Sequence, residues 1–168
     1  MNIINPSRGG NPFSAEQTAE IQRVLGQGKV IVYPTDTLYG LGADATSSVA
    51  VDMLYSLKSR ENSPISVLLA STAQLFEMVT DLSKNALELI ETFMPGALTV
   101  ICKSKYEFAP QLISDNGTVG FRVPDHKISC LLPELFGKPI TTTSVNPAGK
   151  KPASSKADVE AYYDKQVE

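Results

Sequence analysis

The chain has 168 residues, of which 42% are hydrophobic and 20% are charged, and its formal net charge is −3. This length and composition fit one globular domain with a full hydrophobic core, and the net charge argues against a surface that binds nucleic acid throughout. The chain has no apolar run of the roughly 20 residues that span a bilayer and no signal-peptide core, which favours a cytoplasmic protein without membrane contact.

The first predicted helix begins at Ser14, after an extended arm or edge strand over residues 1–13. Ser14 and Gln17 fit a capping box, in which each side chain covers a backbone N–H group at the start of the helix. The glycines within residues 26–28 end the helix. Its predicted buried stripe consists of Ile21, Val24 and Leu25.

A short β-branched run over residues 30–33 predicts a buried strand. Pro34 ends the pairing of this strand, because proline has no N–H group. The loop that follows carries Thr35, Asp36 and Thr37 at the end of a core strand, where open α/β sheets place their ligands. The same pattern also fits a turn that only links two strands.

Helices and strands alternate along the rest of the chain. The predicted helices cover residues 47–58, 71–79, 81–94, 127–136 and the tail from about residue 156. The predicted strands cover residues 65–70, 97–102, 118–123 and 139–144. This alternation predicts the α/β class, with a twisted mixed sheet and flanking helices.

Three details of these helices can be tested. The predicted apolar faces consist of Val49, Met53, Leu54 and Leu57 in the second helix, and of Leu87, Ile90 and Phe93 in the fourth. Ser71 and Gln74 predict a second capping box. Pro133 should shorten or kink the helix over residues 127–136, because it removes one hydrogen bond.

Cations and hydroxyls lie at the ends of several predicted elements. These polar clusters are Thr35-Asp36-Thr37, Lys58 with Arg60, Arg122, and the segment over residues 142–146. Lysine acts on phosphate as a point charge and arginine offers a planar fork, so the set suits polyanions and carboxylates. Taken singly, each cluster also fits a solvated surface or a turn. The chain has neither a Walker A loop nor a GxGxxG motif.

Metal and thiol chemistry receive little support. His126 is the only histidine in the sequence, which excludes a multi-histidine metal centre, and no nucleophile elbow accompanies it. Cys102 and Cys130 lie in apolar runs and resemble small buried hydrophobes. We therefore expect no metal ligands from the protein itself.

Five segments together resemble the YrdC family, the threonylcarbamoyl-AMP synthases. They are VIVYPTDTLYGLGADA, the Lys-x-Arg of LKSRENSP, MPGALTVI, TVGFRVPDH and ITTTSVNPAGKKPASS, in the family's order over roughly residues 20–158. The family signature, Lys-x-Arg followed far downstream by Ser-x-Asn, is met by Lys58, Arg60, Ser144 and Asn146. The resemblance implies one YrdC-like domain over residues 1–168, with a concave pocket and a C-terminus that is short relative to the family.

The resemblance also implies a reaction and its partners. L-threonine, bicarbonate (or CO2) and ATP would give threonylcarbamoyl-AMP and pyrophosphate. Separate transfer enzymes would then pass the threonylcarbamoyl group to the adenosine beside the anticodon in tRNA. A weak contact with tRNA itself stays open.

The resemblance carries site residues over to matching positions. The ATP-side residues are Lys58, Arg60, Thr118, Ser144 and Asn146. The threonine-side residues are Thr35, Thr37, Arg122 and Thr142.

Each of these residue types suits its implied role. Lys58 and Arg60 are the predicted catalytic residues, because with Mg2+ carried by the ATP phosphates they would offset charge that grows on phosphate oxygens. Arg122 can hold the amino acid carboxylate through two parallel hydrogen bonds, and the hydroxyls of Thr35 and Thr142 can orient the substrate. Lys58 and Arg60 are expected in a polar turn after a helix, where truncation costs little stability.

Two departures from the family pattern and one alternative function remain. Glu61 follows Arg60, where the family usually has proline, and the family usually continues past residue 168 into another strand and a Ser-Thr-Val segment. We expect residues 147–155 and the following helix to border the nucleotide instead. The alternative function is a non-catalytic relative that binds tRNA or double-stranded RNA in the same concavity, and the negative net charge weighs against it.

Overall fold

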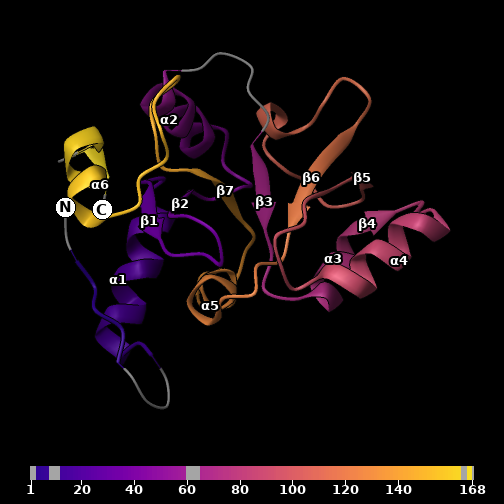
Figure 1. Ribbon diagram of the computed structural model, residues 1–168, viewed down its shortest axis with the longest axis horizontal. Helices are drawn as coiled ribbons and strands as arrows, with labels where there is room; N and C mark the ends of the chain where they lie inside the picture. The colour runs from indigo at the N-terminus through magenta and orange to yellow at the C-terminus, as the bar shows by residue number, and fades with distance from the viewer. Residues whose placement is uncertain (1–2, 8–11, 60–64, 164–165, 168) are drawn as a thin grey trace.

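A seven-stranded mixed sheet forms the centre of the molecule, as Figure 1 shows for the computed structural model. The structure describes residues 3–7, 12–59, 65–163 and 166–167. The strands are β1 (Ile31–Tyr33), β2 (Gly40–Gly42), β3 (Ser66–Leu68), β4 (Val79–Thr80), β5 (Val100–Ser104), β6 (Thr118–Arg122) and β7 (Ile140–Ser144). Their order is β1-β2-β7-β3-β6-β5-β4; β3 and β6 are parallel and the other neighbouring strands are antiparallel. The predicted α/β class with a mixed sheet is confirmed.

Helices flank this sheet on both faces. They are α1 (Ala15–Gly26), α2 (Ser48–Lys58), α3 (Thr72–Met78), α4 (Lys84–Phe93), α5 (Lys127–Phe136) and α6 (Lys156–Tyr163), with a short 3-10 helix, η1 (Pro110–Leu112). Apolar residues of α2, α3 and α4 share one core with β5 and β6, whereas residues of α1 and α5 share a second core with β1. In Figure 1, α3 and α4 lie beside the β4 edge of the sheet and α6 lies near β1.

The capping boxes were predicted with mixed success. At α1 the box is complete: the Ser14 hydroxyl accepts from the Gln17 N–H group at 3.2 Å, and the Gln17 side chain accepts from the Ser14 N–H group at 2.9 Å. At α3 only half of it forms. The Ser71 hydroxyl accepts from the Gln74 N–H group, but the Gln74 side chain accepts from Ala70, one residue earlier than expected.

Two predicted helix faces are wrong in detail, and the predicted shortening of the helix at Pro133 is wrong. In α2, Val49 and Met53 are exposed, because the buried stripe runs through Ala50, Val51, Leu54, Leu57 and Lys58. In α4, Leu87 and Phe93 are largely exposed and Ile90 is buried. The helix α5 runs through to Phe136 because Pro133 is itself buried in the packing, which offsets its lost hydrogen bond.

Two strands were not predicted, and residues 3–7 form no strand. The strand β4 has only two residues, and β2 consists of Gly-Leu-Gly, a poor strand sequence on propensity alone. Close packing explains β2. A Cβ atom on Gly40 or Gly42 would lie 2.8 Å from the ring of Tyr33, so glycine lets the ring lie flat against this strand.

One face of the sheet is covered only in part. Along β6, Val119 and Phe121 are buried on the face that packs against α2 and α3, whereas Thr118, Gly120 and Arg122 point to the other side. On this second face α1 and α5 cover the end near β1. The uncovered remainder is a partly exposed strip in the middle of the sheet, which includes the exposed Ile101 opposite Gly120. Most of the predicted site residues lie along it or at its ends.

Candidate functional site

Three of the four signature residues meet between the end of α2 and the end of β7. Nζ of Lys58 donates to the Ser144 carbonyl oxygen at 2.5 Å and lies 3.4 Å from Oδ1 of Asn146. The Ser144 hydroxyl donates to the same Asn146 oxygen at 2.6 Å. We name Lys58, Ser144 and Asn146 the phosphate-side cluster. Arg60 lies outside the described residues.

The local fold explains why Lys58 lies there. The helix α2 ends at Lys58, because Ser59 takes the left-handed conformation with φ of 49°. The Lys58 carbonyl then accepts from the Ala148 N–H group at 3.0 Å, which holds the segment after β7 against the helix end. The side chain amide of Asn146 donates to the Lys150 carbonyl at 2.7 Å and closes this turn.

The expected solvent exposure of Lys58 is wrong. Its side chain is packed away from solvent, with 1% of its surface exposed, although its position at a helix C-terminus predicts a solvated cation. Burial of an ammonium group requires oxygen partners, and the Ser144 and Asn146 oxygens supply two. A buried, hydrogen-bonded cation at a fixed place is preorganised to receive an anion.

The loop between β1 and β2 carries the first predicted threonine-side residues. The Thr35 hydroxyl accepts from the N–H groups of Thr37 and Leu38, at 3.1 and 3.2 Å, and donates to the Leu38 carbonyl at 2.6 Å. The hydroxyls of Thr35 and Thr37 lie 3.2 Å apart. Thr35 therefore shapes this turn with its own side chain.

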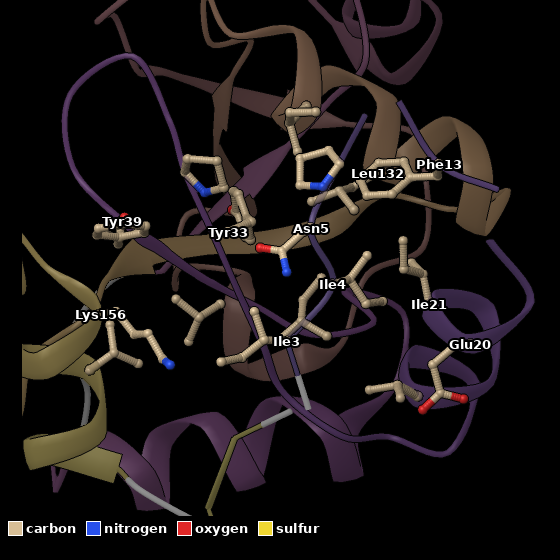
Figure 2. Close-up of a pocket in the computed structure, with 17 residues that line it drawn as sticks. Ile3, Ile4, Asn5, Phe13, Glu20, Ile21, Tyr33, Tyr39, Leu132 and Lys156 are labelled. Atoms are coloured by element: carbon tan, nitrogen blue, oxygen red, sulfur yellow. The ribbon is translucent and has the colours of Figure 1, made fainter. Parts of the chain in front are cut away.

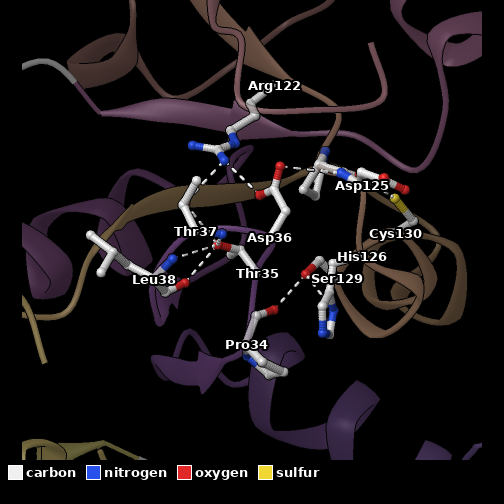
Figure 3. A network of polar contacts seen from close by, with 11 residues as sticks. Pro34, Thr35, Asp36, Thr37, Leu38, Arg122, Asp125, His126, Ser129 and Cys130 are labelled. Carbon is white, nitrogen blue, oxygen red and sulfur yellow. Dashed lines mark hydrogen bonds and ion pairs between the residues drawn. The ribbon is translucent and has the colours of Figure 1, made fainter. Parts of the chain in front are cut away.

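Arg122, at the end of β6, reaches across to this loop (Figure 3). Its Nη2 atom donates to Oδ1 of Asp36 at 2.6 Å and to the Thr37 hydroxyl at 3.1 Å. Nε of Arg122 is buried and has no hydrogen-bond partner in the described part of the chain. We name Asp36, Thr37 and Arg122 the carboxylate-side cluster. Asp36 was missing from the predicted site, although its place between two threonines in the loop was a usable signal.

Thr142 is the remaining predicted threonine-side residue. It stands on β7 directly opposite Ser66 of β3. The buried Tyr33 hydroxyl donates to the Thr141 carbonyl at 3.1 Å. Burial raises the pKa of Tyr33 far above its usual value, while a hydrogen bond from the Thr142 side chain and the charge of Arg122 oppose the rise. Tyr33 therefore remains a neutral phenol beside Thr142.

Thr118 is separated from both clusters. It lies at the start of β6, four residues before Arg122, which is about 13 Å along a strand. Its hydroxyl lies 2.7 Å from that of Ser114. Lys103 of β5 is its cross-strand neighbour. The structure thus places Thr118 on the open strip of the sheet without a contact to Lys58 or Asn146 among the described residues.

Two cavities lie near these residues. The smaller one, of about 270 Å3, lies between the β1–β2 loop and the segment before α6. Its walls are Pro34, Thr35, Thr37, Leu38, Tyr39, Ala153 and Ser154. The segment over residues 147–155 was expected to border the nucleotide; here it supplies Ala153 and Ser154 to a cavity beside the threonine-side loop. A cavity of this size can hold an amino acid.

The larger cavity, of about 380 Å3, is mostly apolar (Figure 2). It lies between the arm over residues 3–6, α1, β1, α5 and α6. Ile3, Ile4, Phe13 and Leu132 line it, with Glu20 and Lys156 among its few charged residues. It offers no cluster of donors for phosphate or carboxylate, so we assign the candidate site to the two polar clusters and the smaller cavity.

Comparison with known proteins identifies the family. The family model of Sua5, YciO and YrdC, which carries the description telomere recombination, matches residues 23–168. The chain belongs to the Sua5/YciO/YrdC family. The sequence-based recognition of this family is therefore confirmed.

Relatives and a solved structure of the Sua5/YciO/YrdC family agree with this. A protein named threonylcarbamoyl-AMP synthase from Saccharophagus degradans is 37% identical over 86% of this chain and 76% of its own length. One of the same name from Bacillus subtilis is 35% identical over 87% of this chain, which spans only 42% of that relative. P. abyssi Sua5 complexed with L-threonine superposes with a TM-score of 0.80 at 30% identity, over 90% of this chain and 46% of that one. These names support the predicted enzyme class.

The described ranges offer little for metal, thiol or membrane chemistry. There, no group of three or more His, Cys, Asp and Glu side chains could hold a metal ion. Cys102 and Cys130 are free, and burial raises the pKa of both thiols, which keeps them protonated and unreactive. None of the helices described is long and apolar enough to cross a bilayer.

Proposed function

We propose that this protein is an L-threonylcarbamoyladenylate synthase, which converts L-threonine, bicarbonate or CO2, and ATP into threonylcarbamoyl-AMP and pyrophosphate. The observation that carries the proposal is the contact of Lys58 with Ser144 and Asn146. These two residues lie 86 and 88 positions after Lys58 in the chain. The names of the relatives and the threonine complex of P. abyssi Sua5 support it.

The two clusters would divide the substrates between them. Arg122 would bind the threonine carboxylate, and the smaller cavity beside Thr35 and Thr37 would hold the amino acid. Thr142, next to Tyr33, would contribute a hydroxyl to the same substrate. Lys58, Ser144 and Asn146 would hold the phosphates, with Arg60 and Thr118 as the further ATP-side residues.

The reaction requires that the substrates are oriented and that the growing charge on the phosphate oxygens is compensated. The threonine nitrogen, carboxylated by CO2 or by bicarbonate with loss of water, presents a carbamate oxygen that attacks the α-phosphorus while pyrophosphate leaves. Lys58 and Arg60 offset the charge that grows on the phosphate oxygens, and the Mg2+ that accompanies ATP contributes further positive charge. Because positioning supplies much of the rate, no nucleophilic side chain is required.

The chemistry of the product indicates which reaction must follow this one. A mixed anhydride of a carbamate and AMP is an activated acyl group, so a transfer enzyme must consume it. We propose the adenosine beside the tRNA anticodon as the final acceptor, in the cytoplasm, with the transfer enzymes as partners. A weak contact with tRNA belongs to the same proposal.

Pyrophosphate release tests the proposal. The purified protein should release pyrophosphate from ATP and Mg2+ only when both threonine and bicarbonate are present. Omission of either one should return the rate to background. Binding of tRNA without this dependent release would favour the RNA-binding alternative and overturn the proposal.

A further inference from the structure

Asp36 connects three parts of the site (Figure 3). Its Oδ1 atom accepts from Nη2 of Arg122 at 2.6 Å, and its Oδ2 atom accepts from the Asp125 N–H group at 3.4 Å. The carboxylate therefore joins the β1–β2 loop to the end of β6 and to the start of α5. The two side chains of the ion pair are 12% and 19% exposed, so solvent screens this pair only in part.

The pair uses the guanidinium in an unusual way. An arginine and a carboxylate commonly form two parallel hydrogen bonds, which occupy two nitrogens of the fork. Here Asp36 and Thr37 both accept from Nη2, and Nε is buried without a partner in the described part of the chain. Arg122 is thus anchored through one nitrogen and keeps N–H donors for another carboxylate.

The loop that carries Asp36 is itself held in place. The Ser129 hydroxyl of α5 donates to the Pro34 carbonyl at 2.5 Å and lies 3.3 Å from Nδ1 of His126. Asp36 is therefore a carboxylate on a supported loop, and its contact can fix the guanidinium. An arginine without such a contact retains rotamer freedom that a ligand would have to remove on binding.

We propose that Asp36 is a positioning residue, which fixes Arg122 so that its remaining N–H donors meet the carboxylate of the amino acid substrate. This inference rests on the proposed function. Asp36 itself need not touch the substrate. Its role predicts an effect on amino acid binding through Arg122, with little effect on ATP binding.

Steady-state kinetics of Asp36→Asn tests the role, because this change keeps the shape of the side chain and removes its charge. We expect the KM for threonine to rise about tenfold or more, the scale on which loss of a supporting hydrogen-bond partner weakens a ligand site. The KM for ATP should change less than twofold. Asp36→Glu, which restores the charge, should recover part of the threonine KM. A threonine KM equal to that of the wild type in Asp36→Asn would overturn the proposal.

Two comparisons separate positioning from a structural role. Lys138→Met removes a second ion pair, that of Lys138 with Asp44 at 3.0 Å, and should leave the threonine KM unchanged. In an Arg122→Met background, Asp36→Asn should add no further loss of threonine binding, because it acts through Arg122. An added loss of the same size there would contradict the proposal.

The selectivity for threonine over threonine amide keeps the test valid if a variant folds poorly. The ratio of the two kcat/KM values does not depend on the folded fraction, and it should fall in Asp36→Asn. An unchanged ratio would overturn the positioning role. If the wild type itself neither binds threonine nor releases pyrophosphate, the proposed function fails first, and this inference fails with it.

Discussion

The phosphate-side and carboxylate-side clusters differ in burial and in the way they hold their cations. Lys58 is 1% exposed and lies among oxygens of β7 and the turn after it. Arg122 is partly exposed at a strand end and meets a carboxylate from a loop. A buried cation is part of the packing, whereas a partly exposed ion pair can be altered without rebuilding a core. We therefore expect changes in the first cluster to affect both fold and chemistry, and changes in the second to affect mainly substrate choice.

Replacement of Lys58 should have the largest effect. Lys58→Met removes the buried charge, and kcat for pyrophosphate release should fall by about 100- to 1,000-fold, the range for loss of one preorganised electrostatic contact. The Ser144 carbonyl also loses this donor. The free energy of unfolding should therefore fall by about 1–3 kcal/mol, measured by denaturant titration. Lys84→Met, at an exposed position at the start of α4, is the control and should change neither quantity.

Replacement of Arg122 should have the second largest effect, mainly on binding of the amino acid substrate. Arg122→Met should raise the threonine KM and abolish the preference for threonine over threonine amide, because the buried donors for the carboxylate are gone. The free energy of unfolding should fall by only about 0.2–1 kcal/mol, less than for Lys58→Met, because the Asp36–Arg122 pair is partly exposed. Unaltered selectivity in competition assays would show that Arg122 does not bind the carboxylate.

A change in β2 tests the packing between the two clusters, because Gly40 pairs with Ser144 of β7 and lies against Tyr33. Gly40→Ala would place a Cβ atom 2.8 Å from the Tyr33 ring, and this overpacking should lower the free energy of unfolding by about 1–3 kcal/mol. Gly26→Ala is the matched control. A Cβ atom there meets nothing within 4 Å, so alanine at the end of α1 should be neutral or stabilising. Equal stability of the two variants would contradict the close packing of Tyr33.

The smallest expected effect concerns Tyr33 at high pH. Its folded-state pKa is raised above the unfolded value of about 10, so the unfolded chain releases this proton first and stability falls as pH rises beyond that value. The stabilising contribution is present below pH of about 10 and is lost at a slope of up to about 1.4 kcal/mol per pH unit. Denaturant titrations of the wild type and Tyr33→Phe between pH of about 9 and 11 measure the difference. Parallel pH profiles would show that Tyr33 ionises normally in the folded state.

Local chemistry predicted much of the fold. The capping box of Ser14 and Gln17 and the stripe of Ile21, Val24 and Leu25 are confirmed, because both depend on contacts within one helix. Strands with β-branched runs were also placed correctly within one or two residues, except that β5 begins three residues later than expected. Exposed apolar residues such as Val49 and Phe93 were misplaced, because helical periodicity defines a stripe but not which neighbour covers it.

The family, the site residue types and the existence of the polar loop were therefore determined by the sequence itself, since each rests on short motifs and their order. Tertiary structure decided three other features. It buried Lys58 against oxygens more than eighty residues away, made a strand of Gly-Leu-Gly under the ring of Tyr33, and joined Asp36 to Arg122. All three depend on which distant groups meet in the folded chain. Residue spacing within one segment does not reveal contacts between distant segments. Those contacts depend on packing and desolvation between separate helices and strands.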